Sequence, residues 1–341
     1  MHNHKQETSL SAENDLWLAP YQPKDKEEWD SFVTASRNGT IFHTQAFLSY
    51  HSVDRFDDAS FLLHDPRGRL RAVCPAVIHA DSTGLKILNS HPGSTYGGLV
   101  VDPEFTLNES LQAVALTEGH ARSLGAQAVE FRHTEKVFQQ LPSEDLDFAL
   151  EVSGFRWSKR ELSSALMLAG LTPETILSSM GSRNRGYLKK ALRSGLEVRL
   201  SDDYAEFHNM LTGTLAQRHA ARPTHTLEEM EKLRDILGGR VRLFGGFMSG
   251  KIVAGAWLIR CNAKAAHTFY LAQDYAFEHL RPLRAVLHEV IRWQIEHGYR
   301  YLNFGISTED GGRAMNHGLF RFKESFGARG VIRTTYRKDL Q

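Results

Sequence analysis

The chain has 341 residues, of which 41% are hydrophobic and 24% are charged, the proportions of an ordinary soluble globular protein. At about 150 residues per domain, this length predicts two domains. The 41 basic residues balance 40 acidic ones to a formal net charge of +1. This balance excludes a protein that binds polyanions through its overall charge, so any site for nucleic acid or another anion has to be a local patch.

Cysteine content and hydropathy narrow the class further. The two cysteines, Cys74 and Cys261, sit in apolar, strand-like runs and exclude a disulfide framework. The first 16 residues are polar, show no secretory signal and are predicted to form a disordered tail. No run of about 18 apolar residues occurs, so we expect no transmembrane segment and a cytoplasmic location.

The first half of the chain predicts, in order, a helix, a hairpin, a strand, a second helix and a second strand. Apolar runs on both sides of Gly68 are typical of a hairpin. Leu111 and Val114 lie on one face of the second helix, and Gly125 stands where a helix commonly stops. The predicted ranges are 26–36, 60–79, 97–101, 108–124 and 128–131.

The second half predicts the same order after a strand and two helices. Thr172 and Pro173 indicate the start of a helix that runs towards Gly195. Gly250 marks a hairpin turn, and Gly298 marks the end of a strongly amphipathic helix. The predicted ranges are 162–168, 172–195, 203–218, 242–261, 267–271, 282–297, 301–304 and 318–327. Hairpin, strand, helix, glycine and strand therefore occur twice, which indicates a tandem duplication of one α/β unit.

The segment 175–196 is basic and contains no acidic residue. Arg185, Lys189 and Arg193 are spaced four residues apart, so they share one face of the predicted helix. Like charges in this arrangement repel each other by a few tenths of a kcal/mol. Two interpretations stay open: a solvated basic face, or a site for phosphate, pyrophosphate or a nucleic-acid backbone. The planar fork of arginine favours the anion site.

The region after the last predicted strand is the second candidate site. Loops at the carboxyl ends of strands commonly bind ligands in α/β proteins, and here Asn303 and Phe304 lead into a glycine-containing loop. Lys323 lies among phenylalanines on the short helix 318–327. Its ammonium group either reaches out from an apolar face or holds a phosphate or an oxyanion in a cleft.

Several short motifs in this order resemble the Fem family of acyltransferases, within the GNAT superfamily. In the second half they are Arg183–Ala191 with Gly195–Val198, Thr214 with Gln217–His219 and Pro223, Ile252–Gly255, Phe269–Tyr270, Gly298–Arg300 with Asn303–Gly305, and Phe322–Lys323 with Gly327. The first half is similar more loosely, at Gly39–His43 and Tyr96–Leu99. The resemblance covers about residues 29–330.

The resemblance implies two tandem GNAT-like domains with mixed α/β sheets. Because the last strand of such proteins can return to the first domain, the expected division is 17–158 with 329–341, and 159–328. It also implies transfer of an aminoacyl or acyl group onto an amine of a cell-envelope, peptidoglycan or polysaccharide precursor. The implied partners are charged tRNA and a nucleotide-sugar or lipid-linked precursor.

The loop that precedes the amphipathic helix 282–297 indicates which donor supplies the acyl or aminoacyl group. In GNAT enzymes that use CoA, a glycine-rich loop and a helix N-terminus hold the pyrophosphate. The corresponding stretches here, Gln273–Arg284 and Pro103–Asn108, contain no glycine. Side chains would crowd the backbone, which favours aminoacyl-tRNA. Arg281 and Arg284 are candidate donor-phosphate ligands, so acyl-CoA stays open as the alternative.

Acyl transfer needs a positioned amine and stabilisation of developing charge, and we hypothesise these roles for two residues. Lys323 would neutralise charge that develops at the transferring ester, and Tyr270 would orient the amine. The candidate substrate-binding residues are Arg183, Arg185, Lys189, Arg218, His219, Asn303, Phe304 and Phe322. No Ser–His–Asp or Cys–His arrangement is evident, and His219 is either a general base or a structural histidine. We expect no metal and no tightly bound cofactor. A non-catalytic module that binds RNA or another anion is the third open reading.

Overall fold

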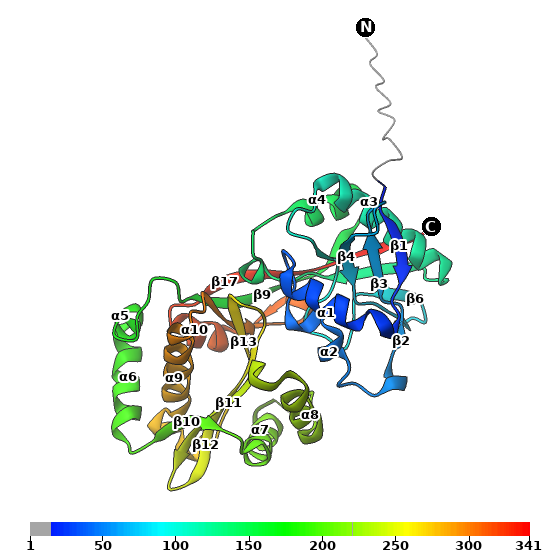
Figure 1. Ribbon diagram of the computed structural model, residues 1–341. Helices are drawn as coiled ribbons and strands as arrows, with labels where there is room; N and C mark the ends of the chain where they lie inside the picture. The colour runs from blue at the N-terminus through cyan, green and yellow to red at the C-terminus, as the bar shows by residue number, and fades with distance from the viewer. Residues whose placement is uncertain (1–14, 220) are drawn as a thin grey trace.

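One large mixed sheet runs through both halves of the chain in the computed structural model, which describes residues 15–219 and 221–341 (Figure 1). Its strand order is β10-β11-β12-β13-β14-β9-β17-β8-β6-β5-β2, and a smaller sheet has the order β1-β3-β4-β7. The predicted α/β class is therefore confirmed. Most of the predicted N-terminal tail, including residues 1–14, lies outside the described residues.

The strands and helices have the following bounds. The strands are β1 Trp17–Pro20, β2 Asp57–Asp58, β3 Phe61–His64, β4 Leu70–Cys74, β5 Val77–Ala80, β6 Lys86–Asn89, β7 Val100–Val101, β8 Ala128–Arg132, β9 Arg156–Met167, β10 Glu197–Ser201, β11 Val241–Met248, β12 Lys251–Arg260, β13 Ala265–Gln273, β14 Tyr301–Ile306, β15 Thr308–Glu309, β16 Ala314–Met315 and β17 Arg329–Asp339. The helices are α1 Lys26–Ala35, α2 Gln45–Leu48, α3 Leu107–Ser123, α4 Asp145–Val152, α5 Ile176–Ser179, α6 Ser182–Arg193, α7 Tyr204–His219, α8 Leu227–Leu237, α9 Pro282–Glu296 and α10 His317–Glu324.

The repeated unit is present in both halves. The hairpin β3–β4 is followed by three strands (β5, β6 and β7), then by α3 and β8, and the hairpin β11–β12 is followed by one strand (β13), then by α9 and β14. Each unit contains one parallel pair, β6 with β8 and β13 with β14. Gly125 and Gly298, which follow the two helices, have φ angles of 72° and 76°, the left-handed conformation that favours glycine. The duplicated order predicted from the sequence is confirmed.

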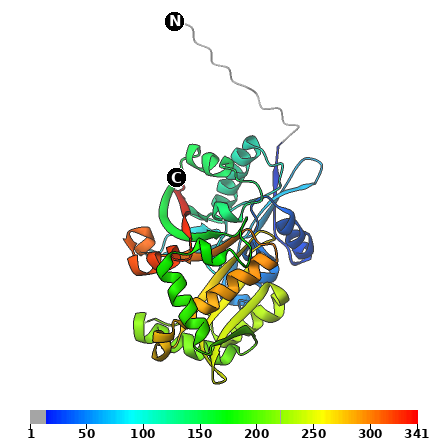
Figure 2. The ribbon, with the colours of Figure 1, turned by 90° about the vertical axis from the view of Figure 1, so that its left-hand side faces the viewer.

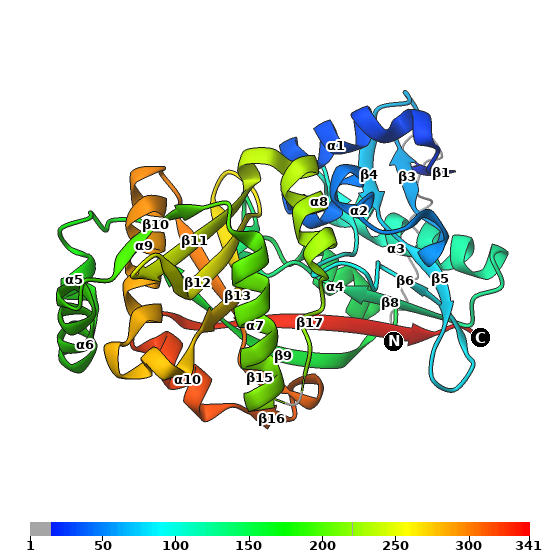
Figure 3. The same cartoon turned by 90° about the horizontal axis from the view of Figure 1, so that it is seen from below.

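Two long central strands join the halves. Strand β17 pairs with β8 on one side and with β9 on the other, and β9 pairs in turn with β14. Figure 3 shows β17 and β9 running along the molecule beneath both units. The C-terminal strand thus completes the sheet of the first half and links it to the second.

An aromatic core also spans the two halves. It gathers Phe42, Phe47 and Tyr96 from the first half with Phe207 and Trp257 from the second, all of which are buried. Burial of large apolar side chains is the main force that holds such an interface together, at roughly 1.5–3 kcal/mol per side chain. The two halves are therefore packed against each other through this core, which holds the walls of any site between them in place.

Three segments differ from the sequence predictions. The predicted helix 172–195 is two helices, because Met180 and Gly181 are extended and separate α5 from α6. Thr172 does not cap a helix; it forms a turn with Thr175. The second run of the first predicted hairpin is divided at Pro75 between β4 and β5, since proline lacks the N–H that a continuous strand needs. Helix α8, not predicted, starts with a capping box of Thr226 and Glu229.

Candidate functional site

A cleft opens where β13 and β14 separate. The two strands pair only between Ala265–His267 and Tyr301–Asn303, although β13 continues to Gln273 and β14 to Ile306. The gap leads into a cavity of about 510 Å³, large enough for a small substrate. We call it the cleft. Its lining comes from both halves: Phe47, Tyr50, His51, Arg55, residues 92–95, Arg132, Thr224, His225, residues 267–270, residues 304–306 and Arg333.

Lys323 is held beneath the β14 wall of the cleft. Its side chain, on α10, is 2% exposed, and Nζ donates to the carbonyl oxygens of Gly305 and Ile306, each at 2.8 Å. Burial lowers the pKa of Lys323 to about 7, because a charged amine is poorly solvated there. Lys323 therefore exists as both ammonium and amine near neutral pH. Both carbonyls belong to residues that line the cleft.

A buried polar network fixes the end of β14. Asn303 Oδ1 lies 3.0 Å from His267 Nδ1 and accepts from the backbone N–H of Gly305 at 2.6 Å. Asn303 Nδ2 donates to Glu135, which belongs to the first half, and Tyr96 donates to the same carboxyl at 3.1 Å. Burial raises the pKa of Glu135 to about 7. Asn303 thus positions the cleft wall from behind, and Glu135 was not among the residues predicted from the sequence.

Tyr270, His225 and Tyr50 form a hydrogen-bonded chain on the cleft wall. Tyr270 Oη lies 2.9 Å from His225 Nδ1, and Tyr50 Oη lies 3.2 Å from His225 Nε2. Burial lowers the pKa of His225 to about 4, so the imidazole is neutral at pH 7. A neutral imidazole has one donor and one acceptor nitrogen, so His225 can pass a proton between the two hydroxyl groups. His225 was not among the residues predicted from the sequence.

Positive charge dominates the remaining polar lining of the cleft. Arg333 makes a two-nitrogen contact with Glu161 Oε2 at 3.0 and 2.7 Å. Arg132 donates to the carbonyl oxygen of Ser94 at 3.1 Å. Arg55 lies 3.3 Å from Glu229. Two of these three guanidinium groups are therefore paired with carboxylates that lie outside the lining. Arg132 is the lining arginine without an ion pair among the described residues, and a guanidinium group favours carboxylate and phosphate ligands.

The predicted basic residues of α6 do not line the cleft. Arg183 and Lys189 are exposed on the helix, and Arg185 donates to the carbonyl oxygen of Met180 at 2.6 Å. Arg218 and His219 end α7, and their side chains are outside the described part of the chain. Of the predicted residues, Tyr270 and Phe304 line the cleft, whereas Phe322 does not. Asn303 and Lys323 contact the β14 wall from behind. The basic helix forms a separate surface.

Arg284 ties three helices together. Its guanidinium group donates to Asn184 Oδ1 on α6 and to Ser325 Oγ after α10. It also lies over the rings of Tyr187 and Phe322, at 5.1 and 5.4 Å. Figure 2 shows α6 alongside α9. Arg284 is thus engaged within the fold, whereas Arg281, which lies 3.4 Å from Glu278, is half exposed.

Replacing Arg284 with alanine should destabilise the protein by about 1–3 kcal/mol, because Asn184 Oδ1 loses its partner and the ring contacts vanish. Urea unfolding of the variant measures the loss. Arg193→Ala, which removes an exposed arginine from α6, serves as the control and should change stability by less than about 0.5 kcal/mol. Equal stability of the two variants would contradict this role of Arg284.

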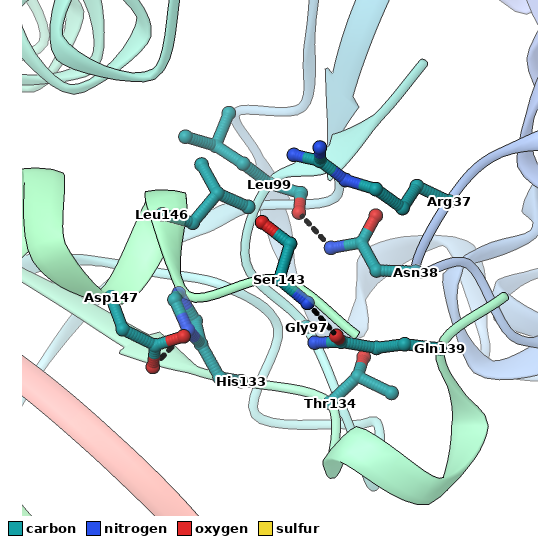
Figure 4. Close-up of a pocket in the computed structure, with 10 residues that line it drawn as sticks. All are labelled: Arg37, Asn38, Gly97, Leu99, His133, Thr134, Gln139, Ser143, Leu146 and Asp147. Carbon is teal, nitrogen blue, oxygen red and sulfur yellow. Dashed lines mark hydrogen bonds and ion pairs between the residues drawn. The ribbon is translucent and has the colours of Figure 1, made fainter. Parts of the chain in front are cut away.

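A second hollow lies within the first half, between α4 and the loop after α1. Figure 4 shows its lining, in which His133 Nδ1 lies 3.4 Å from Asp147 Oδ1. Its volume is about 10 Å³, room for no more than one water molecule. This hollow is therefore too small for a substrate.

Comparisons with known proteins place the fold. Residues 180–323 match the family described as an acetyltransferase (GNAT) domain. The structure of FemX superposes with a TM-score of 0.73 at 14% identity, covering 95% of this chain and 97% of FemX. The chain has the Fem-like tandem GNAT fold. The matched segment is similar to an acetyltransferase domain of the GNAT type, and the resemblance found in the sequence is confirmed at the level of fold.

Two further structures share this fold over most of their length. The C-terminal domain of a putative lysylphosphatidylglycerol synthetase from Agrobacterium fabrum has a TM-score of 0.58 at 15% identity, covering 93% of this chain and 92% of that one. A tandem GNAT protein from the clavulanic acid biosynthesis pathway has a TM-score of 0.57 at 11% identity, covering 95% and 98%. Comparison with curated proteins finds no match.

The described residues contain no group of three His, Cys, Asp or Glu side chains placed to hold a metal ion. No helix in residues 15–219 and 221–341 combines the length and apolar character needed to cross a bilayer.

Proposed function

We propose that the protein transfers an aminoacyl or acyl group onto an amine held in the cleft between its two halves. The separation of β13 from β14 carries this proposal, because it places Tyr270 and the Lys323-bound end of β14 on one cavity. The transfer forms a C–N bond and breaks the bond between the acyl carbon and the donor oxygen or sulfur. The attacking amine must lose a proton, and the leaving group must gain one.

Lys323 supplies the positive charge that this reaction needs. Two of the three N–H groups of its ammonium form donate to Gly305 and Ile306, and among the described hydrogen bonds the third has no acceptor. A preorganised donor in a water-poor site stabilises developing negative charge strongly. Lys323 lies behind the wall residues Gly305 and Ile306, so in this proposal its positive charge acts through that wall on the oxygen that becomes negative at the transferring carbonyl.

The chain Tyr270–His225–Tyr50 supplies a path for the proton. Tyr270 accepts a hydrogen bond from the backbone N–H of His225 at 3.1 Å, which fixes its hydroxyl at the cleft wall. A proton from the amine would pass to Tyr270 Oη as the Tyr270 proton moves to His225 Nδ1. The Nε2 proton of His225 would move to Tyr50 Oη, and the Tyr50 proton would pass to the leaving oxygen or sulfur in the cleft. This arrangement provides the general base that the sequence did not reveal.

For the donor we propose aminoacyl-tRNA. The segment before α9 forms a 3₁₀ turn over Tyr275–Leu280, and Arg281, with φ 59°, stands at the N-cap. Side chains therefore occupy the backbone that a glycine-rich loop would leave open to a pyrophosphate. The exposed cations of α6 offer a surface for a phosphate backbone. The acceptor proposed from the Fem resemblance is an amine of a cell-envelope or polysaccharide precursor, presented on a nucleotide-sugar or a lipid.

Acyl-CoA is the alternative donor, favoured by the match of residues 180–323 to an acetyltransferase domain. In that reading Arg281, at the start of α9, is the available phosphate ligand, since Arg284 is engaged with Asn184 and Ser325. A non-catalytic RNA-binding module is the third reading. It would show salt-sensitive tRNA binding without turnover.

Parallel calorimetric titrations with charged tRNA and acetyl-CoA distinguish the donors. We expect tRNA to bind and Arg183→Ala/Lys189→Ala to weaken it about tenfold or more, because two phosphate contacts are lost. Lys24→Ala/Arg67→Ala, a matched removal of two exposed charges from the first half, should bind as the wild type does. Micromolar binding of acetyl-CoA that Arg281→Ala abolishes would refute the tRNA donor and support the alternative.

A further inference from the structure

A third cavity lies where the two halves of the chain meet, apart from the cleft and from the hollow of Figure 4. It shares no lining residue with the cleft. It has a volume of about 200 Å³. Its walls are the loop after α1 and the turn between β12 and β13, with one residue before β11: Val33, Thr34, Gly39, Thr40, Ile41, Thr44, Arg240, Arg260, Cys261, Asn262 and Ala263. A phosphate group with several neighbouring atoms fits this volume.

Two arginines line this cavity, and a third lies near them, because of the strand register. Arg242 on β11 is opposite Leu258 on β12, and Val241 is opposite Ile259. The next pair along the ladder would be Arg240 and Arg260, which both line the cavity. Arg242 lies two residues from Arg240, on the same side of the sheet as Arg260. The fold therefore places three guanidinium groups at the paired ends of two adjacent strands.

No carboxylate of the described residues forms an ion pair with these arginines. Among the ion pairs of the described residues, none involves Arg240, Arg242 or Arg260. Burial and then the charges of Arg240 and Arg242 lower the pKa of Arg260. The positive charge of Arg240 acts to lower the pKa of the Asp30 carboxyl group. The oxygens of this carboxyl group also accept hydrogen bonds from the backbone N–H groups of Gln45 and Ala46. Like charges gathered without a counter-ion are unfavourable unless an anion binds them.

The other polar groups of the cavity are already satisfied within the fold. Thr34 and Thr44 donate their hydroxyl hydrogens to Asp30 and Ile41 carbonyl oxygens. Asn262 Nδ2 donates to the carbonyl oxygens of Gly39 and Phe138. Arg260 lies over the ring of Tyr299 at 5.4 Å, and its Nε has no hydrogen-bond partner. The guanidinium groups are therefore the donors left for a ligand.

We infer that this cavity binds a phosphate group, held by Arg240 and Arg260 with Arg242 adding to the local positive charge. The class of ligand is a small phosphomonoester or inorganic phosphate, because the cavity is enclosed by both halves and is small. Planar guanidinium groups bind phosphate oxygens in pairs. Since the walls come from the two halves, the bound anion stabilises their packing. The site is independent of the donor and acceptor proposed for the cleft.

Calorimetric titration with inorganic phosphate at low ionic strength tests the site, with sodium chloride at matched ionic strength as the reference. We expect saturable binding to one site and a rise in Tm that chloride does not produce. Arg260→Ala should weaken phosphate binding at least tenfold. Because this variant also loses the Tyr299 contact, Arg240→Ala, which removes an exposed side chain, should show the same loss with an unchanged fold. Arg313→Ala, at a side chain 81% exposed elsewhere in the second half, should bind as the wild type does.

Two results would overturn the site. One is the absence of saturable phosphate binding in the wild type. The other is equal phosphate affinity in wild type, Arg240→Ala and Arg260→Ala. If charged tRNA but not phosphate binds in a way that Arg240→Ala weakens, the arginines belong to a nucleic-acid surface and the small-phosphate site is wrong.

Discussion

Lys323→Ala is expected to lower the turnover number about a hundredfold or more, the loss typical of a donor that stabilises charge in the transition state. The assay is transfer from charged tRNA or acyl-CoA to a peptide with a free lysine amine, followed by mass spectrometry. Lys24→Ala removes an exposed lysine from the first half, away from α6, and should leave turnover unchanged. Turnover of Lys323→Ala within about threefold of the wild type would contradict the catalytic role.

The pH profile gives an independent readout of Lys323. The pKa of Lys323 is lowered to about 7, so the ammonium form that the reaction needs is lost as pH rises through 7. We therefore expect kcat to fall above this pH, and Lys323→Arg, which stays charged, to remove that fall. A rate that rises through pH 7 in a Lys323-dependent way would show that the amine acts as a base instead.

Lys323 should also make the free energy of unfolding depend on pH. This free energy should rise over the pH range in which kcat falls. Because burial lowers the pKa of Lys323 in the folded protein from its ordinary value of 10.5 to about 7, the folded protein binds fewer protons than the unfolded chain between pH 7 and about 10. The cost of burying the charge is complete below pH 7 and is relieved as pH rises. The stability of the wild type relative to Lys323→Met should therefore increase from pH 7 to 10. This comparison also shows whether the variant is folded.

His225→Ala is expected to lower kcat by about 10²–10⁴, the usual contribution of a positioned acid or base. The change removes the link between Tyr270 and Tyr50 and breaks the proposed path for the amine proton. Its effect should fall on kcat more than on KM, because His225 contributes little to holding the substrate. Circular dichroism and urea unfolding establish that the variant is folded.

A structural control separates proton transfer from packing. His208 Nε2 lies 3.1 Å from the carbonyl oxygen of His225 and does not line the cleft, so His208→Ala perturbs the same segment without breaking the path. If both histidine variants lose activity equally, His225 acts through the position of its backbone. If only His225→Ala loses turnover, the proton path is supported.

The sequence predicted the repeated order well because that order follows from local patterns. The apolar faces of α3 and α9, and the left-handed glycines Gly125 and Gly298 that follow them, are determined within short windows. The break between α5 and α6 was missed because the helical pattern continues across Met180 and Gly181. Helix α8 could have been found, since Thr226 and Glu229 form a capping box three residues apart.

The candidate site was predicted only in part. Tyr270, Asn303 and Lys323 lie in motifs of the second half, so the Fem resemblance pointed to them. The contact between Tyr50 and His225 joins residues 175 positions apart, and Glu135 reaches Asn303 from 168 positions away. No local pattern encodes such contacts. They arise from packing of the two halves, which the strand β17 and the shared aromatic core bring together.

The most direct test of the account is single-turnover transfer of a labelled amino acid from charged tRNA to the lysine-containing peptide, measured in parallel for the wild type, Lys323→Ala and His225→Ala. The account predicts that the wild type forms the labelled amide and that both variants form it at least a hundredfold more slowly. Transfer at equal rates in all three proteins would show that the reaction does not take place in this cleft.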